Sequence, residues 1–373
     1  MINQFVKLLN YPEIVFIKNI LSPYTKRAYL VGGCVRDIVL GIKNNDFDIE
    51  VYDIEPDKFN EIMISCGANG VGKQFFVYKL KDIDLSLPRK ENKTGTTHRS
   101  FEVEYCNSEK EASMRRDFTM NAMMINIFTG ELVDFWGGME DIKLNQIRHI
   151  DDNKFKEDNL RVLRAVQFSA RFGFDINPST TKLMRDLSLE YLSGERIGLE
   201  LIKFFNSKHP SFGIKALYQL NLFYDLFDLR LSSEMYESLI DRINESIACQ
   251  SYNQYTFLYL LNDLFSVSIE ILPKLRLPKH FEVCWKQKHI IDGGDLDFEL
   301  LNIALTIPLK EWIGLNTFAL VSRAKKLGFF DKTFKTQVHP VQLLDEGFSG
   351  KNLGIELARR KDEEIRIFLA KKI

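Results

Sequence analysis

Apolar and polar residues alternate one by one along much of the first part of the chain, which is typical of half-buried β-strands. Residues 28–31 form an apolar run, and Gly32 and Gly33 after them predict a tight turn. Residues 34–40 favour a short helix, for which Gly41 is a natural end. This strand–turn–helix unit leaves bare backbone at the turn, where a phosphate group could bind.

A second strand is predicted at residues 46–51, with acidic side chains on one face. Asp46, Asp48 and Glu50 alternate there with apolar residues. Residues two apart on a strand lie about 6–7 Å apart on one face, so two of these carboxylates can converge on Mg²⁺ but repel each other without it. A solvated edge strand would show the same alternation. The glycine turn upstream, followed by Arg36, instead favours a site for two-metal phosphoryl or nucleotidyl transfer.

Further strands follow along the chain. Residues 55–66 predict a helix, and residues 74–80 and 82–87 predict two strands. Asp84 lies on the polar face of the second of these strands and is a candidate third carboxylate beside the acidic pair, or else an ordinary exposed aspartate. Residues 88–101 are basic and rich in turn-forming residues, which predicts a mobile loop near an anion or a plain solvated loop.

A helix or turn is predicted at residues 112–122, and a hairpin at residues 123–128 and 131–134. The first segment carries four polar candidates, Arg115, Arg116, Asp117 and Asn121. An Arg–Arg–Asp run is weak support when it stands alone, because such neighbours are common on protein surfaces.

From residue 153 onward the pattern changes to the longer period of helices. Residues 155–174 predict one helix whose polar side carries Glu157, Asp158, Arg161 and Arg164. An ordinary ion pair on the helix surface is the alternative interpretation of these charges. Residues 206–373 predict more helices, with basic clusters at 325–326 and 359–361. The sequence therefore predicts an α+β fold, with a mixed-sheet head followed by an all-helical remainder.

Composition limits the possible functions. The 373 residues carry a formal net charge of −1, so nucleic-acid binding would depend on local basic patches. The five cysteines show no Cys-x-x-Cys spacing, which favours reduced thiols and a cytoplasmic location. No apolar run approaches the roughly 18 residues of a membrane span, and residues 1–22 do not resemble a signal peptide. The oligomeric state cannot be inferred from these features.

The motifs together resemble the class II tRNA nucleotidyltransferase and bacterial poly(A) polymerase family. They are GGCVRD with the acidic strand DFDIEVY, then RRDFTMNA, DFWGGMEDI and EDNLR, in this order. The resemblance covers residues 27–205. It implies a polymerase β-like catalytic head at residues 1–148, a helical neck at 149–205 that recognises the base, and a tRNA-binding body and tail at 206–373.

The family resemblance implies addition of C, C and A to the 3′ end of tRNA from CTP and ATP, with Mg²⁺ as the cofactor. Asp46 and Asp48 would bind the metal, and Asp84 would complete the catalytic carboxylates. The implied nucleotide-binding residues are Gly32, Gly33, Arg36, Arg115, Arg116, Asp117, Asn121, Glu157, Asp158, Arg161 and Arg164. Many members carry another arginine where this chain has Gln167.

The chemistry of base selection follows from hydrogen-bonding patterns. Cytosine and adenine both present an amino donor beside a ring-nitrogen acceptor. Asp158 can accept from the amino group and Arg161 can donate to the ring nitrogen. Uracil and guanine present the reverse order, and a buried mismatch of this kind costs on the order of several kcal/mol. One Asp/Arg pair can therefore select C and A without a nucleic-acid template.

Several alternatives remain open at this point. Within the family, the chain could be an A-adding or CC-adding specialist or a poly(A) polymerase. Residues 71–78 partly match a signature of the poly(A) polymerase branch, although Gln74 interrupts its basic pair. Outside these activities, the chain could be an inactive tRNA-binding protein, but the intact Asp46 and Asp48 argue against this.

Overall fold

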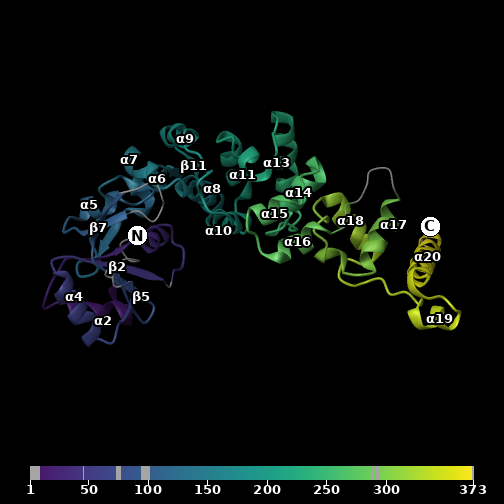
Figure 1. Cartoon of the computed structure of the whole chain (residues 1–373), viewed down its shortest axis with the longest axis horizontal. Coiled ribbons are helices and arrows are strands. Elements are labelled where there is room, and N and C mark those ends of the chain that lie inside the picture. Colours follow the sequence, from purple (N-terminus) through teal and green to yellow (C-terminus); the bar gives the residue numbers. More distant parts are fainter. Residues whose placement is uncertain are drawn as a thin grey trace. The chain divides into compact units, whose positions relative to one another are not determined.

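The computed structural model describes residues 9–44, 46–72, 77–93, 101–287, 289 and 295–371. The chain divides into two compact units, Met1–Leu192 and Ser193–Ile373. The first contains the mixed sheet and the second is helical wherever regular structure is described (Figure 1). The domain boundaries expected after residues 148 and 205 remain predictions.

The first unit alternates helices and strands, as the alternating pattern indicated. Its elements are α2 (Pro12–Leu21), β1 (Ala28–Val31), α3 (Gly33–Val39), β2 (Phe47–Val51), α4 (Pro56–Ser65), β3 (Asn69–Gly72), β4 (Val77–Leu80), β5 (Ile83–Ser86), β6 (Arg89–Lys93), β7 (Phe101–Tyr105), α5 (Glu109–Met114), the 3₁₀ helix η2 (Thr119–Asn121), β8 (Met124–Asn126), β9 (Leu132–Val133), α6 (Gly138–Lys143), β10 (Gln146–Ile147), α7 (Asp152–Lys156), α8 (Leu160–Phe172), β11 (Asp175–Ile176) and α9 (Pro178–Arg185).

The main sheet of this unit has the strand order β3-β4-β5-β2-β1-β8-β9. β2 and β5 run parallel, whereas their other neighbours run antiparallel, so the sheet is mixed. All four residues of β1 are buried. On one face Tyr29 and Val31 pack in a cluster with Ala112 of α5. The turn after β1 is therefore held at the centre of the sheet.

The segment after β5 differs from its sequence interpretation. Residues 89–93 form strand β6, which pairs antiparallel with β7, so the expected loop over residues 88–101 was wrong for this part. Residues 94–100 lie outside the described part of the chain. Strand β3 was missed because its sequence, Asn-Gly-Val-Gly, is poor in strand-forming residues. Gln74 also lies outside the described residues.

The single helix expected over residues 155–174 is also wrong. The structure has two helices, α7 and α8, with Glu157, Asp158 and Asn159 between them. Asp158 Oδ1 accepts a hydrogen bond from the backbone N–H of Leu160 at 3.2 Å. An aspartate that binds the backbone in this way satisfies a donor at the start of a helix, which favours a new start over continuation.

The second unit contains the helices α10 (Gly194–Phe205), α11 (Pro210–Gln219), α12 (Leu222–Phe227), α13 (Ser233–Ala248), α14 (Thr256–Phe265), α15 (Ile271–Lys274), α16 (Lys279–Trp285), α17 (Leu296–Ala304), the 3₁₀ helix η3 (Leu309–Glu311), α18 (Phe318–Leu327), α19 (Pro340–Asp345) and α20 (Gly350–Ala370). Pro210 and Pro340 occupy the first turns of α11 and α19, where the missing N–H leaves no hydrogen bond unmade. Within the described chain, no helix is long and apolar enough to cross a bilayer.

Candidate functional site

The acidic face of β2 continues across the sheet onto β5. Asp48 lies directly opposite Asp84 in the parallel register, so both side chains project from the same face. The pKa of Asp48 is raised, first by desolvation and then by the negative charges of Asp46, Asp84 and Glu50. Arg116 opposes this rise. Carboxylates that repel one another in this way are the arrangement that a divalent cation stabilises.

The oxygen atoms of this acidic pair suit a hard cation. Asp84 Oδ1 is buried without a hydrogen-bond partner among the described residues, and Lys79 Nζ lies 3.7 Å from it. In the described part of the chain, no group of three or more His, Cys, Asp or Glu side chains is arranged to hold a metal ion. The expected metal ligands Asp46 and Asp48 therefore stay a prediction. Mg²⁺ fits such a site, because it is bound through few carboxylates and takes its other oxygens from water and phosphates.

The glycine turn after β1 brings the acidic strand and one arginine together. Gly32 has φ +75°, and a Cβ atom there would lie 2.9 Å from Arg116 Nη1 and 3.8 Å from Asp48 Oδ2. A side chain at Gly32 would therefore displace the arginine as well as strain the backbone. A Cβ atom on Gly33 would lie 3.3 Å from Arg36 Nη2. Both glycines thus leave room for guanidinium groups.

Arg115 and Arg116 converge on one buried carboxylate, which sequence reasoning had placed only on the acidic face. Glu50 is 1% exposed and accepts from Arg115 Nη2 at 2.8 Å and from Arg116 Nη2 at 2.9 Å. Tyr52 Oη also donates to it, at 3.1 Å. Burial alone would raise the pKa of Glu50, but the two arginines hold that pKa below its usual value. The strand alternation carried no signal that this acidic residue is buried.

Asp117 joins the loop after α5 to helix α8. Its Oδ1 accepts from Asn121 Nδ2 at 2.8 Å, and its Oδ2 accepts from Arg164 Nε at 2.7 Å. Burial would raise the pKa of Asp117, but Arg164 and the hydrogen bond from Asn121 hold that pKa below its usual value. Asn121 Oδ1 in turn accepts from Arg36 Nη1 at 2.6 Å. Four of the expected nucleotide-binding residues therefore form one connected network.

Arg36 lies inside this network and away from solvent. It is 4% exposed, and it donates from Nε and Nη2 to Asp37 Oδ1 at 2.9 and 2.7 Å. Its guanidinium carbon also lies 4.8 Å from the centre of the Phe172 ring. In this position Arg36 braces the loop and helices around the turn. The expected contact of Arg36 with a triphosphate stays a prediction, and the burial of this side chain does not favour the contact.

The start of α8 lies beside the Arg115–Arg116 segment. Arg161 donates from Nη1 to the carbonyl of Lys154 and from Nη2 to the carbonyl of Arg115, each at 2.6 Å. Glu157 forms an ion pair with Lys154 at 2.9 Å. The structure thus places Asp158 and Arg161 at the same end of α8, with Arg161 connected directly to the loop that carries the two arginines.

A cavity of about 430 Å³ opens beside Asp46. Its basic lining residues are Lys43, Lys79 and Arg171. Arg171 Nη2 lies 3.1 Å from Asp37 Oδ2. Sequence reasoning missed Arg171, although its place about two helical turns after Arg164 on the same helix could have identified it.

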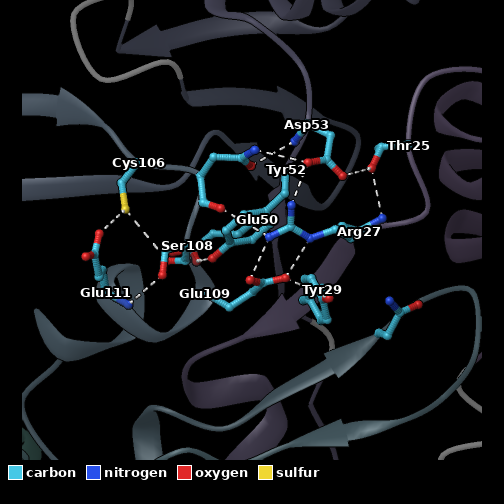
Figure 2. Close-up of polar contacts among 12 residues, drawn as sticks. Thr25, Arg27, Tyr29, Glu50, Tyr52, Asp53, Cys106, Ser108, Glu109 and Glu111 are labelled. Atoms are coloured by element: carbon cyan, nitrogen blue, oxygen red, sulfur yellow. Dashed lines mark hydrogen bonds and ion pairs between the residues drawn. The ribbon is translucent and has the colours of Figure 1, made fainter.

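A polar cluster at the far end of β2 fixes the start of α5 (Figure 2). Arg27 Nη1 lies 2.5 Å from Asp53 Oδ1, and Arg27 Nη2 lies 2.7 Å from Glu109 Oε2. Tyr29 Oη donates to Glu109 at 2.9 Å. Because Asp53 follows β2 and Glu109 begins α5, Arg27 holds together the two elements that lead to Glu50 and to the paired arginines.

Two family models match parts of this chain. Residues 28–148 match the family described as the poly A polymerase head domain. Residues 173–230 match the family described as a probable RNA and SrmB-binding site of polymerase A. Over these residues the chain is similar to the CCA-adding enzyme and poly(A) polymerase family, as the sequence motifs indicated.

Relatives of this family extend the comparison. The multifunctional CCA protein of Nitrosospira multiformis is 36% identical over 194 residues, which are 50% of this chain and 45% of the relative. That of Haemophilus influenzae is 36% identical over 213 residues, covering 54% and 50% of the two chains. The chain thus spans about half the length of the curated relatives it matches.

Solved structures of the family share the fold of this chain. The Thermotoga maritima CCA-adding enzyme complexed with tRNA aligns with a TM-score of 0.69 and 22% identity, covering 100% of this chain and 98% of that one. The Bacillus stearothermophilus CCA-adding enzyme in complex with CTP aligns with a TM-score of 0.65 and 22% identity, covering 95% of this chain and 92% of that one. The expected α+β fold class is confirmed.

Proposed function

We propose that this protein is a tRNA nucleotidyltransferase that adds C, C and A to the tRNA 3′ end from CTP and ATP without a nucleic-acid template. The observation that carries the proposal is the meeting of Asp48, Asp84 and Arg116 beside the bare backbone of Gly32. Carboxylates for a cation, an arginine for phosphates and a turn without side chains are the groups that nucleotidyl transfer requires. The CCA-adding names of the relatives and the CTP and tRNA complexes of the structural neighbours support the same reaction.

In this reaction Asp46 and Asp48 would hold Mg²⁺, and Asp84 would stand beside them as the third carboxylate. Bound Mg²⁺ supplies Lewis-acid chemistry, which makes the tRNA 3′-hydroxyl a better nucleophile and neutralises charge on the phosphates. The hydroxyl attacks the α-phosphorus in line, a new phosphodiester bond forms and pyrophosphate leaves. Arg116 would bind the phosphates over Gly32, because an arginine presents several N–H donors to phosphate oxygens.

Base selection would belong to Asp158 and Arg161, as the hydrogen-bonding patterns of C and A suggest. The two carbonyl contacts of Arg161 fix its guanidinium, which has more N–H donors than these contacts use. Asp158 is held close by, through its contact with the N–H of Leu160. A pre-positioned pair of this kind loses little conformational freedom when a base binds, which favours discrimination of C and A from U and G.

We place the reaction in the cytoplasm, where reduced thiols are the rule, and all five cysteines of the chain are free. Specialised A addition, specialised CC addition and poly(A) synthesis remain the competing activities. They differ in which nucleotides are added and in how many, and not in the chemistry of the step, so the products must decide among them.

The test uses the purified protein with Mg²⁺ and tRNA transcripts that end at the discriminator base, at C or at CC. Each is given CTP, ATP or both, and the products are sized on a sequencing gel. Addition of CC and then A, with no further growth, supports the proposal. Addition of A only, and only to the CC-ended transcript, identifies an A-adding specialist. Addition of CC only, to the shortest transcript, identifies a CC-adding one. A ladder of A residues identifies a poly(A) polymerase, and no product on any transcript contradicts the enzymatic proposal.

A further inference from the structure

One buried carboxylate links the metal-binding strand to both arginines of the Arg–Arg–Asp segment. Glu50 lies on the same face of β2 as Asp48 but is almost inaccessible to solvent. It accepts from both Arg115 and Arg116, and Tyr52 donates to it as well. The carboxylate and the two guanidinium groups lose water on burial, and their mutual attraction offsets this cost only when the hydrogen bonds between them are well formed. Well-formed bonds of this kind fix the positions of both arginines.

We infer that Glu50 is a positioning residue for nucleotide binding, which acts through Arg116 on the phosphates and through Arg115 on the base-selecting arginine. This inference rests on the proposed function. Neither the motif pattern nor the acidic face of β2 had assigned Glu50 such a role.

The first connection runs from Glu50 to the glycine turn. The Nη2 atom of Arg116 donates to Glu50, while its Nη1 atom lies above Gly32, close to where a Cβ atom would stand. One end of the guanidinium is thus anchored and the other faces the turn. Without the hydrogen bond to Glu50, the Arg116 side chain would lose more conformational entropy on reaching the same position when the phosphates bind.

The second connection runs from Glu50 to the start of α8. The Nη2 atom of Arg115 donates to Glu50, and its backbone carbonyl accepts from Arg161 Nη2. Glu50 therefore holds the residue on which Arg161 rests. Helix α5 ends directly before Arg115, and the Arg27 cluster holds the N-terminal end of this helix through Glu109 (Figure 2). The segment that carries both arginines is therefore restrained through Glu50 and through α5.

The test compares steady-state constants for wild type, Glu50→Gln and Glu50→Asp with CTP, ATP and tRNA varied in turn. We expect Glu50→Gln to raise KM for both nucleotides about 10- to 100-fold, the loss expected for charge-assisted hydrogen bonds. KM for tRNA should stay unchanged, and incorporation of UTP and GTP on the CC-ended transcript should increase. Glu50→Asp keeps the buried charge, so it serves as the variant that folds if Glu50→Gln does not, and it should show a smaller change in the same constants.

Tyr52→Phe is the matched control, since it removes one contact of Glu50 and leaves both arginines in place. It should keep the nucleotide KM near the wild-type value. The inference would be overturned if both Glu50 variants had KM values for CTP and ATP within twofold of wild type. It would also be overturned if KM rose equally for nucleotide and for tRNA, or if Tyr52→Phe raised the nucleotide KM as much as the Glu50 variants do. A wild-type protein that extends no transcript would instead contradict the proposed function itself, so the two failures can be told apart.

Discussion

Arginine–carboxylate pairs occur in both units of the molecule, but in different surroundings. In the first unit Glu50 and Asp117 are buried and hold Arg115, Arg116 and Arg164. In the second unit the pairs of α20 are more exposed, although Glu356 is only 15% exposed. Arg359 there contacts Glu356 at 2.8 Å, with its side chain 58% exposed. Arg360 binds Glu346 and Glu356.

The difference in burial decides what each group of pairs can do. A buried carboxylate cannot exchange its arginine for water without a large cost, so it fixes the arginine in one position. An exposed pair is screened by solvent and salt, and its side chains keep their freedom to move. We therefore expect nucleotide addition to depend on the buried pairs of Glu50 and Asp117 and to change little when the pairs of α20 are removed.

The largest effect is expected at the acidic face that the buried pairs surround. Asp48→Asn should lower the rate of nucleotide addition on the order of 1,000-fold or more, because stabilisation by a bound metal amounts to several kcal/mol of the barrier. Binding of tRNA, measured by filter retention, should change little. Asp57→Asn on the exposed start of α4 is the control and should keep full activity. An active Asp48→Asn protein would contradict the metal-binding role of this residue.

A smaller and more selective effect is expected at Arg161, which rests on the Arg115 carbonyl. Arg161→Ala should raise the misincorporation of UTP and GTP relative to CTP and ATP, because the donor that rejects a ring N–H is gone. Competition between pairs of nucleotides on the CC-ended transcript measures this ratio. Arg185→Ala, at the end of α9, serves as a control. Unchanged selectivity in Arg161→Ala would refute its part in base selection.

The sequence predicted the elements of the head better than the contacts between them. The alternation of residues 46–51 correctly gave strand β2, and the glycines gave the turn before α3. The alternation could not reveal that Glu50 is buried, because burial depends on Arg115 and Arg116, which come from a distant segment. The expected long helix failed for a local reason, since Asp158 binds the N–H of Leu160 at the start of α8.

The pair of Asp117 and Arg164 should affect stability in a pH-dependent way. Asp117→Asn removes the charge that Arg164 needs, and we expect a loss of about 3 kcal/mol in the free energy of unfolding at neutral pH. The pKa of Asp117 is lowered in the folded protein, so its contribution is present above the unfolded pKa of about 3.9 and is lost as the pH falls through the lower folded value. Urea unfolding at several pH values should therefore show that the difference in the free energy of unfolding between Asp117→Asn and wild type shrinks below about pH 4. A difference independent of pH would show that the ion pair is not its source.

The smallest effect is expected on α20, which tests the other side of the comparison. The basic cluster at residues 359–361 lies in the part of the chain that the family resemblance assigns to tRNA binding. Arg359 and Arg360, however, are paired with Glu356, Glu346 and Glu363. Arg359→Gln and Arg360→Gln should leave the unfolding midpoint within error of wild type, because exposed pairs contribute little. Glu356→Gln removes the shared acidic partner and is the matched variant. If Glu356→Gln strengthened tRNA binding and the arginine variants weakened it, with a shallower dependence on salt, these arginines would contact RNA phosphates. Equal affinities for all three would leave α20 with no part in binding.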